Sequence, residues 1–268
     1  RTIGRAGDGP GELRAVTVLA LGRSDSLYAI DAAGSKISVF DATGVFARSA
    51  VILPNGRFFA GAVLPNGSLA TTGQVGGMSA TIPLHILAAS ARVAHSFGDS
   101  GDATEAGAMR PIAVDARGTI LATYRFRHEV DRFDSAGVLL AKYAIESDWF
   151  GRGNAEWSPN PSEPPPVNAR RISVDSAGLV WLFSYVPRTD WAKAVRPVGG
   201  GRSGFRYDAF KAFATRVEVV DLAAKKVLAS QVIPLFIGHA MSGGFVSSYD
   251  ETEDGVPVIT ISRLSLRR

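Results

Sequence analysis

The sequence contains no cysteine, and this absence excludes several classes of protein at once. Without cysteine there is no disulfide framework, no cysteine-ligated zinc site, no iron–sulfur cluster and no thiol nucleophile. Long apolar runs are lacking too, since none approaches the roughly 18 residues that a membrane-spanning helix needs. Long amphipathic helical patterns are absent as well. The sequence therefore predicts no transmembrane segment and argues against a helical or disulfide-stabilised fold.

Neither sign of charge dominates the chain. It has 29 basic and 25 acidic residues, a formal net charge of +4, and no run of Lys and Arg that would mark a nucleic-acid-binding arm. With 46% hydrophobic and 20% charged residues among 268, the chain can bury a sizeable core. We therefore expect a folded protein that does not bind nucleic acid.

Short runs rich in Val, Ile, Phe and Ala recur along the chain, separated by tight polar turns. Asp hydrogen-bonds to its own backbone in such turns, and Gly supplies a positive φ. Strands ending in Phe40-Asp41, Phe133-Asp134 and Val220-Asp221 follow one another at about 90 residues, or two units of the size of a four-stranded propeller blade. Four turns share an Asp-x-x-Gly frame: Asp41–Gly44, Asp115–Gly118, Asp134–Gly137 and Asp175–Gly178.

These repeats predict an all-β fold, a β-propeller of four-stranded antiparallel blades that occupies residues 1–268 as a single domain. Residues 1–5 are expected to add a strand that either completes the last blade of a five-bladed ring or is the outer strand of an incomplete sixth blade. The start at Arg1 rather than Met favours six blades and the loss of an upstream targeting segment. The predicted blade strands are 15–21, 26–31, 36–40 and 45–52; 58–64, 68–73, 82–88 and 92–97; 110–115, 119–125, 128–133 and 138–145; 170–175, 179–186, 215–220 and 226–233; and 235–240, 244–249 and 256–264.

Three segments carry a resemblance to a known family. Ile3–Leu13, which reads IGRAGDGPGEL, resembles the N-terminal Gly-rich segment of NHL-like six-bladed β-propellers. The stretch from Leu27 to Asp41 is similar to their repeat core, and the tail from Gly255 to Leu264 resembles the last strand of bacterial secreted members. The second blade lacks the Ile-x-Val-Phe-Asp strand of that core. The resemblance implies a propeller exported to the periplasm or cell envelope; it does not imply one activity, because such propellers serve as enzymes, receptors and scaffolds.

The connections between the predicted strands are unequal in length. First-to-second and third-to-fourth connections lie on one face of a blade meander, and here they are short throughout. The other face receives every long connection: residues 98–109, 146–169, 187–214 and 249–255. Insertions gathered on one face usually mark the binding face of a repeat protein. The alternative is that these loops plug the channel or pack on each other.

The two longest loops, 146–169 and 187–214, differ in charge. Residues 187–214 hold six basic and two acidic residues, whereas 146–169 hold four acidic residues and one basic residue. Aromatic rings beside Arg suit stacking on sugar rings, peptide side chains or planar anions. The alternative is packing of loop on loop with mutual salt bridges. The candidate ligand-binding residues in these loops are Trp149, Trp157, Arg188, Trp191, Arg206 and Tyr207.

Arginine also recurs near the start of the innermost predicted strands, at Arg14, Arg57, Arg110 and Arg170. Those strand starts approach the axis on the face with long loops, so the four side chains are candidates to ring the channel mouth. The planar guanidinium fork suits carboxylate and phosphate, and such a ring would attract an anion. The alternative is that Glu12 or acidic loop residues pair with these arginines.

Signatures of catalysis or of a metal site are weak. The four histidines, at positions 85, 95, 128 and 239, are scattered without a zinc spacing, and no Gly-x-Ser-x-Gly elbow occurs. The acidic turn at 250–254 is either a weak calcium site or a solvated run of charge.

Two functional hypotheses follow. The favoured one is a non-catalytic binding or scaffold propeller of the bacterial envelope, without a cofactor, which recognises an anionic small molecule, glycan, peptide or protein through its loop-rich face. The alternative is a metal-dependent hydrolase similar to lactonase-like propellers, which hold calcium near the axis. His239 is the only obvious metal-ligand type on the inner strands, so the residues support the hydrolase less well.

Overall fold

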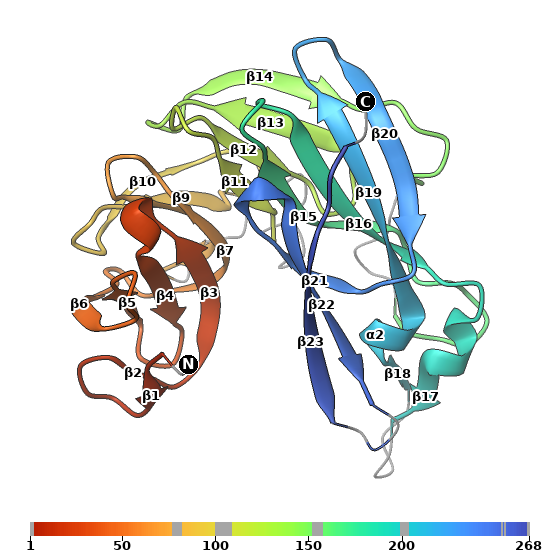
Figure 1. The fold of residues 1–268 in the computed structure, drawn as a ribbon, viewed down its shortest axis with the longest axis horizontal. Coiled ribbons are helices and arrows are strands. Elements are labelled where there is room, and N and C mark those ends of the chain that lie inside the picture. The colour runs from red at the N-terminus through yellow and green to blue at the C-terminus, as the bar shows by residue number, and fades with distance from the viewer. Residues whose placement is uncertain are drawn as a thin grey trace. The chain divides into compact units, whose positions relative to one another are not determined.

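The chain folds into consecutive antiparallel β-sheets, as seen in a computed structural model (Figure 1). The structure describes residues 3–76, 82–99, 109–151, 158–198, 204–252, 254 and 256–266. In these residues, five sheets of three or four strands follow one another along the chain, four of them four-stranded, and each pairs its strands in chain order. The fold is the all-β propeller of four-stranded antiparallel blades that the repeats predict.

The chain divides into two compact units. Unit 1 comprises Arg1–Tyr124 and Val130–Lys142, and unit 2 comprises Arg125–Glu129 and Tyr143–Arg268. The first three sheets consist of β3 (Val16–Leu21), β4 (Leu27–Asp31), β5 (Lys36–Phe40) and β6 (Phe46–Val51); β7 (Gly56–Val63), β8 (Leu69–Val75), β9 (Leu84–Leu87) and β10 (Val93–Phe97); and β11 (Ile112–Val114), β12 (Ile120–Thr123), β13 (Glu129–Phe133) and β14 (Leu139–Ala144).

The fourth and fifth sheets belong to unit 2. The fourth sheet consists of β15 (Asn168–Val174), β16 (Val180–Pro187), β19 (Phe213–Asp221) and β20 (Lys226–Ile233). The fifth consists of β21 (Ile237–Ala240), β22 (Phe245–Glu251) and β23 (Pro257–Arg263). Each predicted blade strand therefore has a counterpart in the structure. In the part of the chain that is described, no helix has the length and apolar character needed to cross a membrane.

The start of the chain differs from the prediction. Instead of forming a blade strand, Arg5–Ala6 (β1) pairs in parallel with Glu12–Leu13 (β2). The Glu12 carboxylate holds this turn together, because it accepts hydrogen bonds from Arg5 Nε at 2.7 Å and from the backbone N–H of Gly9 at 2.7 Å. The Gly-rich segment is thus a local loop whose two short strands pair with each other.

The predicted Asp-x-x-Gly turns are confirmed in detail. In all four, the aspartate Oδ1 accepts backbone hydrogen bonds from the residues two and four positions later, at 2.8–2.9 Å. The glycine that ends each turn has a φ between 71° and 86°, a conformation that costs other residues steric strain. The same hydrogen bonds therefore form each of these turns, and they keep the connections short in the first, third and fourth sheets.

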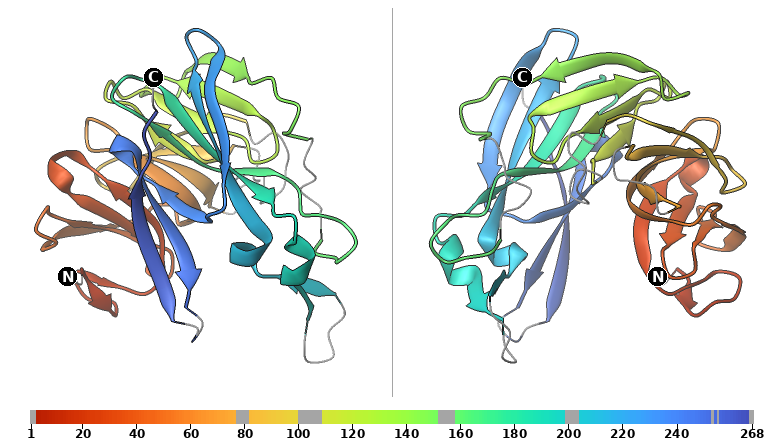
Figure 2. Two further views of the ribbon diagram at one scale, coloured as in Figure 1. Left: turned by 45° about the vertical axis from the view of Figure 1, so that its right-hand side comes forward. Right: turned by 180° about the vertical axis from the view of Figure 1, so that it is seen from behind.

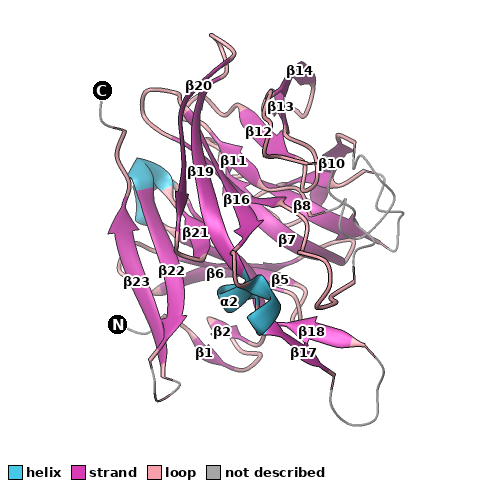
Figure 3. Cartoon of the chain, turned by 90° about the vertical axis from the view of Figure 1, so that its right-hand side faces the viewer, coloured by secondary structure: helices cyan, strands magenta, loops and turns pink. Residues whose placement is uncertain are grey.

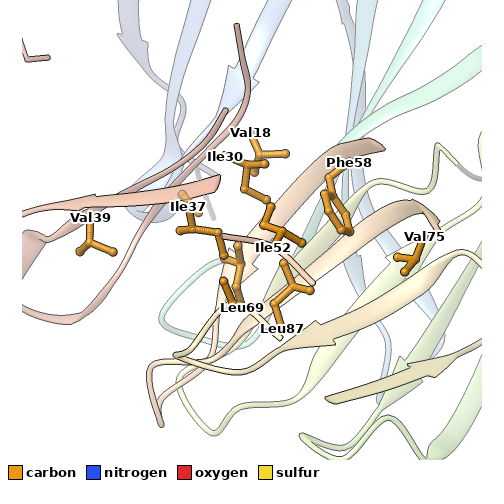
Figure 4. Close-up of a cluster of buried hydrophobic side chains, with 11 residues drawn as sticks. Val18, Ile30, Ile37, Val39, Ile52, Phe58, Leu69, Val75 and Leu87 are labelled. Atoms are coloured by element: carbon orange, nitrogen blue, oxygen red, sulfur yellow. The ribbon is translucent and has the colours of Figure 1, made fainter. Parts of the chain in front are cut away.

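Apolar side chains fill the space between successive sheets within each unit. In unit 1, Val18 and Ile30 of the first sheet pack with Phe58, Leu69 and Leu87 of the second (Figure 4). A second cluster joins the second and third sheets, and in unit 2 a third cluster joins the fourth and fifth. Successive side chains of a strand point to opposite faces of its sheet. A sheet that lies between two others therefore contributes apolar residues to the core on both of its faces.

A β-bulge recurs near the start of the innermost strand in four of the five sheets. The pairing with the second strand shifts by one residue at Thr17, Phe59, Arg170 and Gly238. A bulge leaves one extra residue outside the regular ladder and re-aims the side chains near it. Two of the four bulges, at Arg170 and Gly238, lie in unit 2, where they come into contact.

Candidate functional site

The long segment between β16 and β19 is an ordered insertion, not the simple loop that was predicted. Its described part, residues 188–198 and 204–212, is termed the insertion. It contains a 3-10 helix at Trp191–Ala194, the paired strands β17 (Val195–Pro197) and β18 (Phe205–Tyr207), and the helix α2 (Ala209–Ala212). Because β16 and β19 stay paired as far as Pro187 and Phe213, the insertion grows from the end of their hairpin (Figure 3). Figure 2 shows from two further directions that this end is opposite the β19–β20 turn.

An aromatic cluster anchors the insertion to the fifth sheet. The Phe210 ring on α2 lies 4.1 Å from Tyr249 and 4.7 Å from Phe236, between centroids. Tyr185 in turn lies 4.3 Å from Phe236 and 5.7 Å from Phe213. Tyr207 completes this aromatic cluster by an edge contact with Phe213 at 5.7 Å. These contacts join the insertion, the end of β16 and the end of β22 into one packed surface.

The bulged starts of β15 and β21 meet beside this aromatic cluster. Arg171 Nε donates a hydrogen bond to the Gly238 carbonyl oxygen at 2.7 Å, and Tyr185 donates its hydroxyl proton to the Ile237 carbonyl at 2.9 Å. The Arg170 guanidinium carbon lies 5.4 Å from the centre of the Tyr185 ring. We term this place the β15–β21 junction and define it by Arg170, Arg171, Tyr185, Gly238 and His239.

The junction is positively charged. Among described residues, neither Arg170 nor Arg171 forms an ion pair with a carboxylate, and Arg170 Nε is buried without a hydrogen-bond partner. Burial lowers the pKa of Arg171, with the Arg170 charge adding to the shift and Tyr185 opposing it. Burial likewise raises the pKa of Tyr185, against the effect of the two arginines. Burial and then the Arg171 charge lower the pKa of His239. The shifts of Arg171 and His239 both disfavour the cationic form of the group, whereas that of Tyr185 reflects the burial of its hydroxyl.

The insertion carries a second group of cations. Arg196 and Arg206 stand directly opposite each other on β17 and β18, and both are exposed. Like charges in this position repel, and no described carboxylate pairs with either of them. Arg188 does have a partner, since its Nε lies 3.8 Å from Asp190 Oδ1. Trp191 is half-buried at the start of the 3-10 helix, and its backbone N–H donates to the Arg188 carbonyl.

Trp149 takes part in a buried polar network and not in the insertion surface. Its Nε1 donates to Glu218 Oε1 at 3.2 Å, and the Arg216 guanidinium carbon lies 4.4 Å from its ring centre. His128 Nε2 bonds to Glu218 Oε2 at 2.7 Å, while His128 Nδ1 bonds to Ser147 Oγ at 2.9 Å. The side chains of His128 and Glu218 are 7% and 3% exposed. These contacts fix the segment after β14 to the fourth sheet, so the arginine beside this tryptophan is an internal partner.

The four predicted ring arginines have different surroundings. Arg14 is exposed and pairs with Asp8, and Arg57 is exposed on β7 with its guanidinium 5.3 Å from the Phe59 ring. Arg170 lies at the junction. Arg110 requires a correction: it is fully buried, and its Nη2 bonds to Asp131 Oδ2 at 2.9 Å. With its guanidinium occupied inside unit 1, Arg110 has no free face for a ligand.

Two other predictions concern Trp157 and the acidic turn at 250–254, which the structure describes only in part. Trp157 and Glu253 lie outside the described residues. In the acidic turn, Glu251 Oε1 accepts a hydrogen bond from the Tyr249 hydroxyl at 2.9 Å, and this bond raises the pKa of Tyr249. Within the described ranges, no group of three His, Asp or Glu side chains is placed to hold a metal ion.

Sequence reasoning missed Arg171, and it considered His239 only as a metal ligand of the alternative hydrolase. The one available signal was the Arg170-Arg171 pair at the start of an apolar strand, where two adjacent cations are unusual. It also missed the pairing of His128 with Glu218, which are 90 residues apart in the sequence. No local pattern marks such a pair.

Comparison with known proteins supports the fold. No protein-family model matches the chain, and no curated protein is significantly similar to it. A member of the DUF4221 family from Bacteroides vulgatus has a similar structure, with a TM-score of 0.56 and 11% identity, over 98% of this chain and 82% of that one. A Bacteroides fragilis protein named as a candidate exported protein gives a TM-score of 0.53 and 13% identity, over 92% of this chain and 69% of that one.

A virginiamycin B lyase from Staphylococcus aureus is more distant. Its TM-score is 0.46 at 8% identity, over 94% of this chain and 85% of the lyase. At these identities the similarities concern the propeller fold alone. A shared fold at such identities does not decide between an enzyme and a binding protein.

Proposed function

We propose that the chain is a non-catalytic binding or scaffold propeller, exported to the bacterial envelope, which recognises an acidic partner through the insertion. The observation that carries this proposal is the exposed, opposed pair Arg196 and Arg206, which has no carboxylate partner among the described residues. Placing two like charges side by side is unfavourable in the free protein. An acidic group that binds between them removes that repulsion and gains two guanidinium contacts.

The aromatic residues of the insertion support the same function. Phe205 and Phe210 are 39% and 40% exposed, close to the two arginines in the sequence. Exposed aromatic rings next to arginine are typical of protein and glycan recognition surfaces. The aromatic cluster beneath them keeps the surface in place, because α2 packs on the fifth sheet through Phe210. The partner is therefore expected to be an acidic polymer, either a peptide segment or an anionic glycan.

Export and family are inferred on other grounds. The likeness of Ile3–Leu13 to NHL-like six-bladed propellers supports that family, and the name of the similar Bacteroides fragilis protein supports export.

Binding of polyglutamate and of alginate, measured by calorimetry, tests the proposal. Replacing Arg196 and Arg206 together by Glu is expected to abolish binding of both polymers, since attraction becomes repulsion. Arg206→Ala alone should weaken binding by about two- to fivefold, the effect of one exposed ion pair. Trp191→Ala should also weaken binding while leaving the domain folded.

Arg117→Ala is the matched control. Arg117 is exposed in the Asp115–Gly118 turn of unit 1, so the variant makes the same charge change away from the insertion. Equal losses in Arg117→Ala and Arg206→Ala would show a general charge effect and contradict the proposal. So would wild-type protein that binds neither polymer.

A further inference from the structure

The β15–β21 junction brings two adjacent arginines to the backbone of the next sheet. Two of the three guanidinium nitrogens of Arg171 donate hydrogen bonds to carbonyl oxygens: Nε to Gly238 at 2.7 Å and Nη1 to Arg170 at 2.8 Å. Its Nη2 makes no hydrogen bond to a described residue. Arg170 lies over the Tyr185 ring with a buried, unpartnered Nε. Donors are thus in excess at this place.

The charges at the junction are all of one sign. Around Arg171, the ionisable groups that act on it are Arg170, which is cationic, and Tyr185, a phenol whose pKa is raised further by burial. Around His239, the acting charge is that of Arg171. Two guanidinium groups held close together without an acid are unfavourable unless an anion comes between them.

We propose that the β15–β21 junction is a binding site for one oxyanion, a carboxylate or phosphate group, held by Arg170 and Arg171 with His239 at its rim. The anion accepts hydrogen bonds from Arg171 Nη2 and from the Arg170 guanidinium, whose Nε is otherwise unsatisfied. His239 is partly exposed, so solvent and small anions reach the junction from its side. The carbonyl oxygens at the junction already accept hydrogen bonds, and the group left without a partner is a donor, which suits an anion.

The bulges explain why the site exists at this position. In a regular strand, the two adjacent arginines would point to opposite faces of the sheet. The extra residue at Arg170 breaks this alternation, and the bulge at Gly238 turns a carbonyl oxygen towards Arg171. Since the residues are fixed by the sheets, this site stands independently of whether the insertion binds a partner.

His239 supplies a direct reporter. The full chain has four histidines, and the imidazole resonances of His239 are assigned by comparison with His239→Gln in a proton–nitrogen NMR spectrum. Inorganic phosphate and acetate are titrated separately, each at constant ionic strength with sodium chloride as the balancing salt. An anion bound beside Arg171 offsets its charge, so the pKa of His239 is expected to rise and to saturate with anion concentration. Screening by salt alone gives no saturation.

Two variants and a control accompany the titration. Arg170→Gln keeps both Arg171 bonds and is expected to weaken anion binding by about tenfold or more, because a charged hydrogen-bond donor is lost. Arg171→Lys keeps the charge but loses the fork geometry, and it should weaken binding as well. Arg117→Gln changes an exposed arginine in a turn of unit 1 and should leave the His239 response as in the wild type.

Each result is decisive. A saturable rise with phosphate, with acetate or with both supports an oxyanion site and identifies which group it takes. The proposal is overturned if neither anion produces a saturable shift, or if Arg170→Gln responds as the wild type does. Because the insertion is intact in these variants, polyglutamate and alginate binding measured in parallel separates a failure of this site from a failure of the proposed function.

Discussion

Replacing Arg110 should reveal how much stability one buried ion pair holds in unit 1. Its guanidinium bonds to Asp131 Oδ2 at 2.9 Å and to the Asp99 carbonyl at 2.7 Å, and lies 3.7 Å from the Tyr124 ring centre. The side chains of Arg110 and Asp131 are 0% and 1% exposed. In Arg110→Met the aspartate keeps the Tyr124 hydroxyl as a partner at 2.7 Å but loses its counter-charge. Removing one member of a buried pair costs about 3–5 kcal/mol, so we expect the free energy of unfolding to fall by that amount.

Urea denaturation followed by circular dichroism measures this loss. Arg57→Met serves as the control, because Arg57 is exposed on β7 and a surface substitution changes stability by less than about 0.5 kcal/mol. The double variant Arg110→Met with Asp131→Leu removes both charges. It should regain most of the lost stability, since apolar replacement of a whole buried pair is often neutral.

Two results would refute this reasoning. The first is an Arg110→Met protein as stable as Arg57→Met, because the carboxylate would then have found another way to be stabilised. The second is a double variant no more stable than Arg110→Met, because the loss would then come from packing and not from the uncompensated charge of Asp131.

Three further predictions concern other buried groups. Burial lowers the pKa of His85 below its value of 6.5 in the unfolded chain, so stability should be constant above that pH and fall as the pH drops below it. His85→Gln should flatten this dependence in urea melts at a series of pH values. Glu218→Leu leaves the buried His128 and Trp149 donors without an acceptor, so the free energy of unfolding should fall by about 2–4 kcal/mol. Tryptophan fluorescence should shift to the red, and unchanged emission would contradict the hydrogen bond from Trp149 to Glu218. Gly178→Ala should cost about 1–2 kcal/mol for its positive φ alone, whereas Gly137→Ala must also displace the Phe97 ring, 2.7 Å from the new Cβ, and should melt at a clearly lower temperature.

The strands and turns could be predicted because their causes are local. Alternating apolar residues mark each strand, and the Asp-x-x-Gly turns carry their own hydrogen bonds, as at Asp41 and Asp175. The inserted segment was located correctly, but its β17–β18 hairpin and α2 were missed because such short elements depend on packing against the aromatic cluster. The local sequence pattern therefore predicts the strands of the blades better than the elements of the insertion.

The candidate site could be predicted only in part, because it depends on contacts between sheets. Arg170 was identified from its place at a strand start, yet the same argument selected Arg110, which the buried Asp131 makes structural. The Arg171 bond to Gly238 joins residues 67 positions apart. Beyond the adjacent arginines themselves, the sequence marks neither the bulge at Arg170 nor this contact, since both follow from the register of paired strands.

The recurring bulge gives the propeller a position that is free to vary. At Thr17, Phe59, Arg170 and Gly238 the extra residue stands outside the regular ladder of its sheet, so its identity is not dictated by pairing. The side chains at these positions already differ: a hydroxyl group at Thr17, a phenyl ring at Phe59, a guanidinium at Arg170 and no side chain at Gly238. A mutation at one of them changes the chemistry of one blade while the hydrogen-bonded frame around it is kept. New specificities can therefore arise in this fold by single substitutions, blade by blade, with the cost in stability confined to the position that changes.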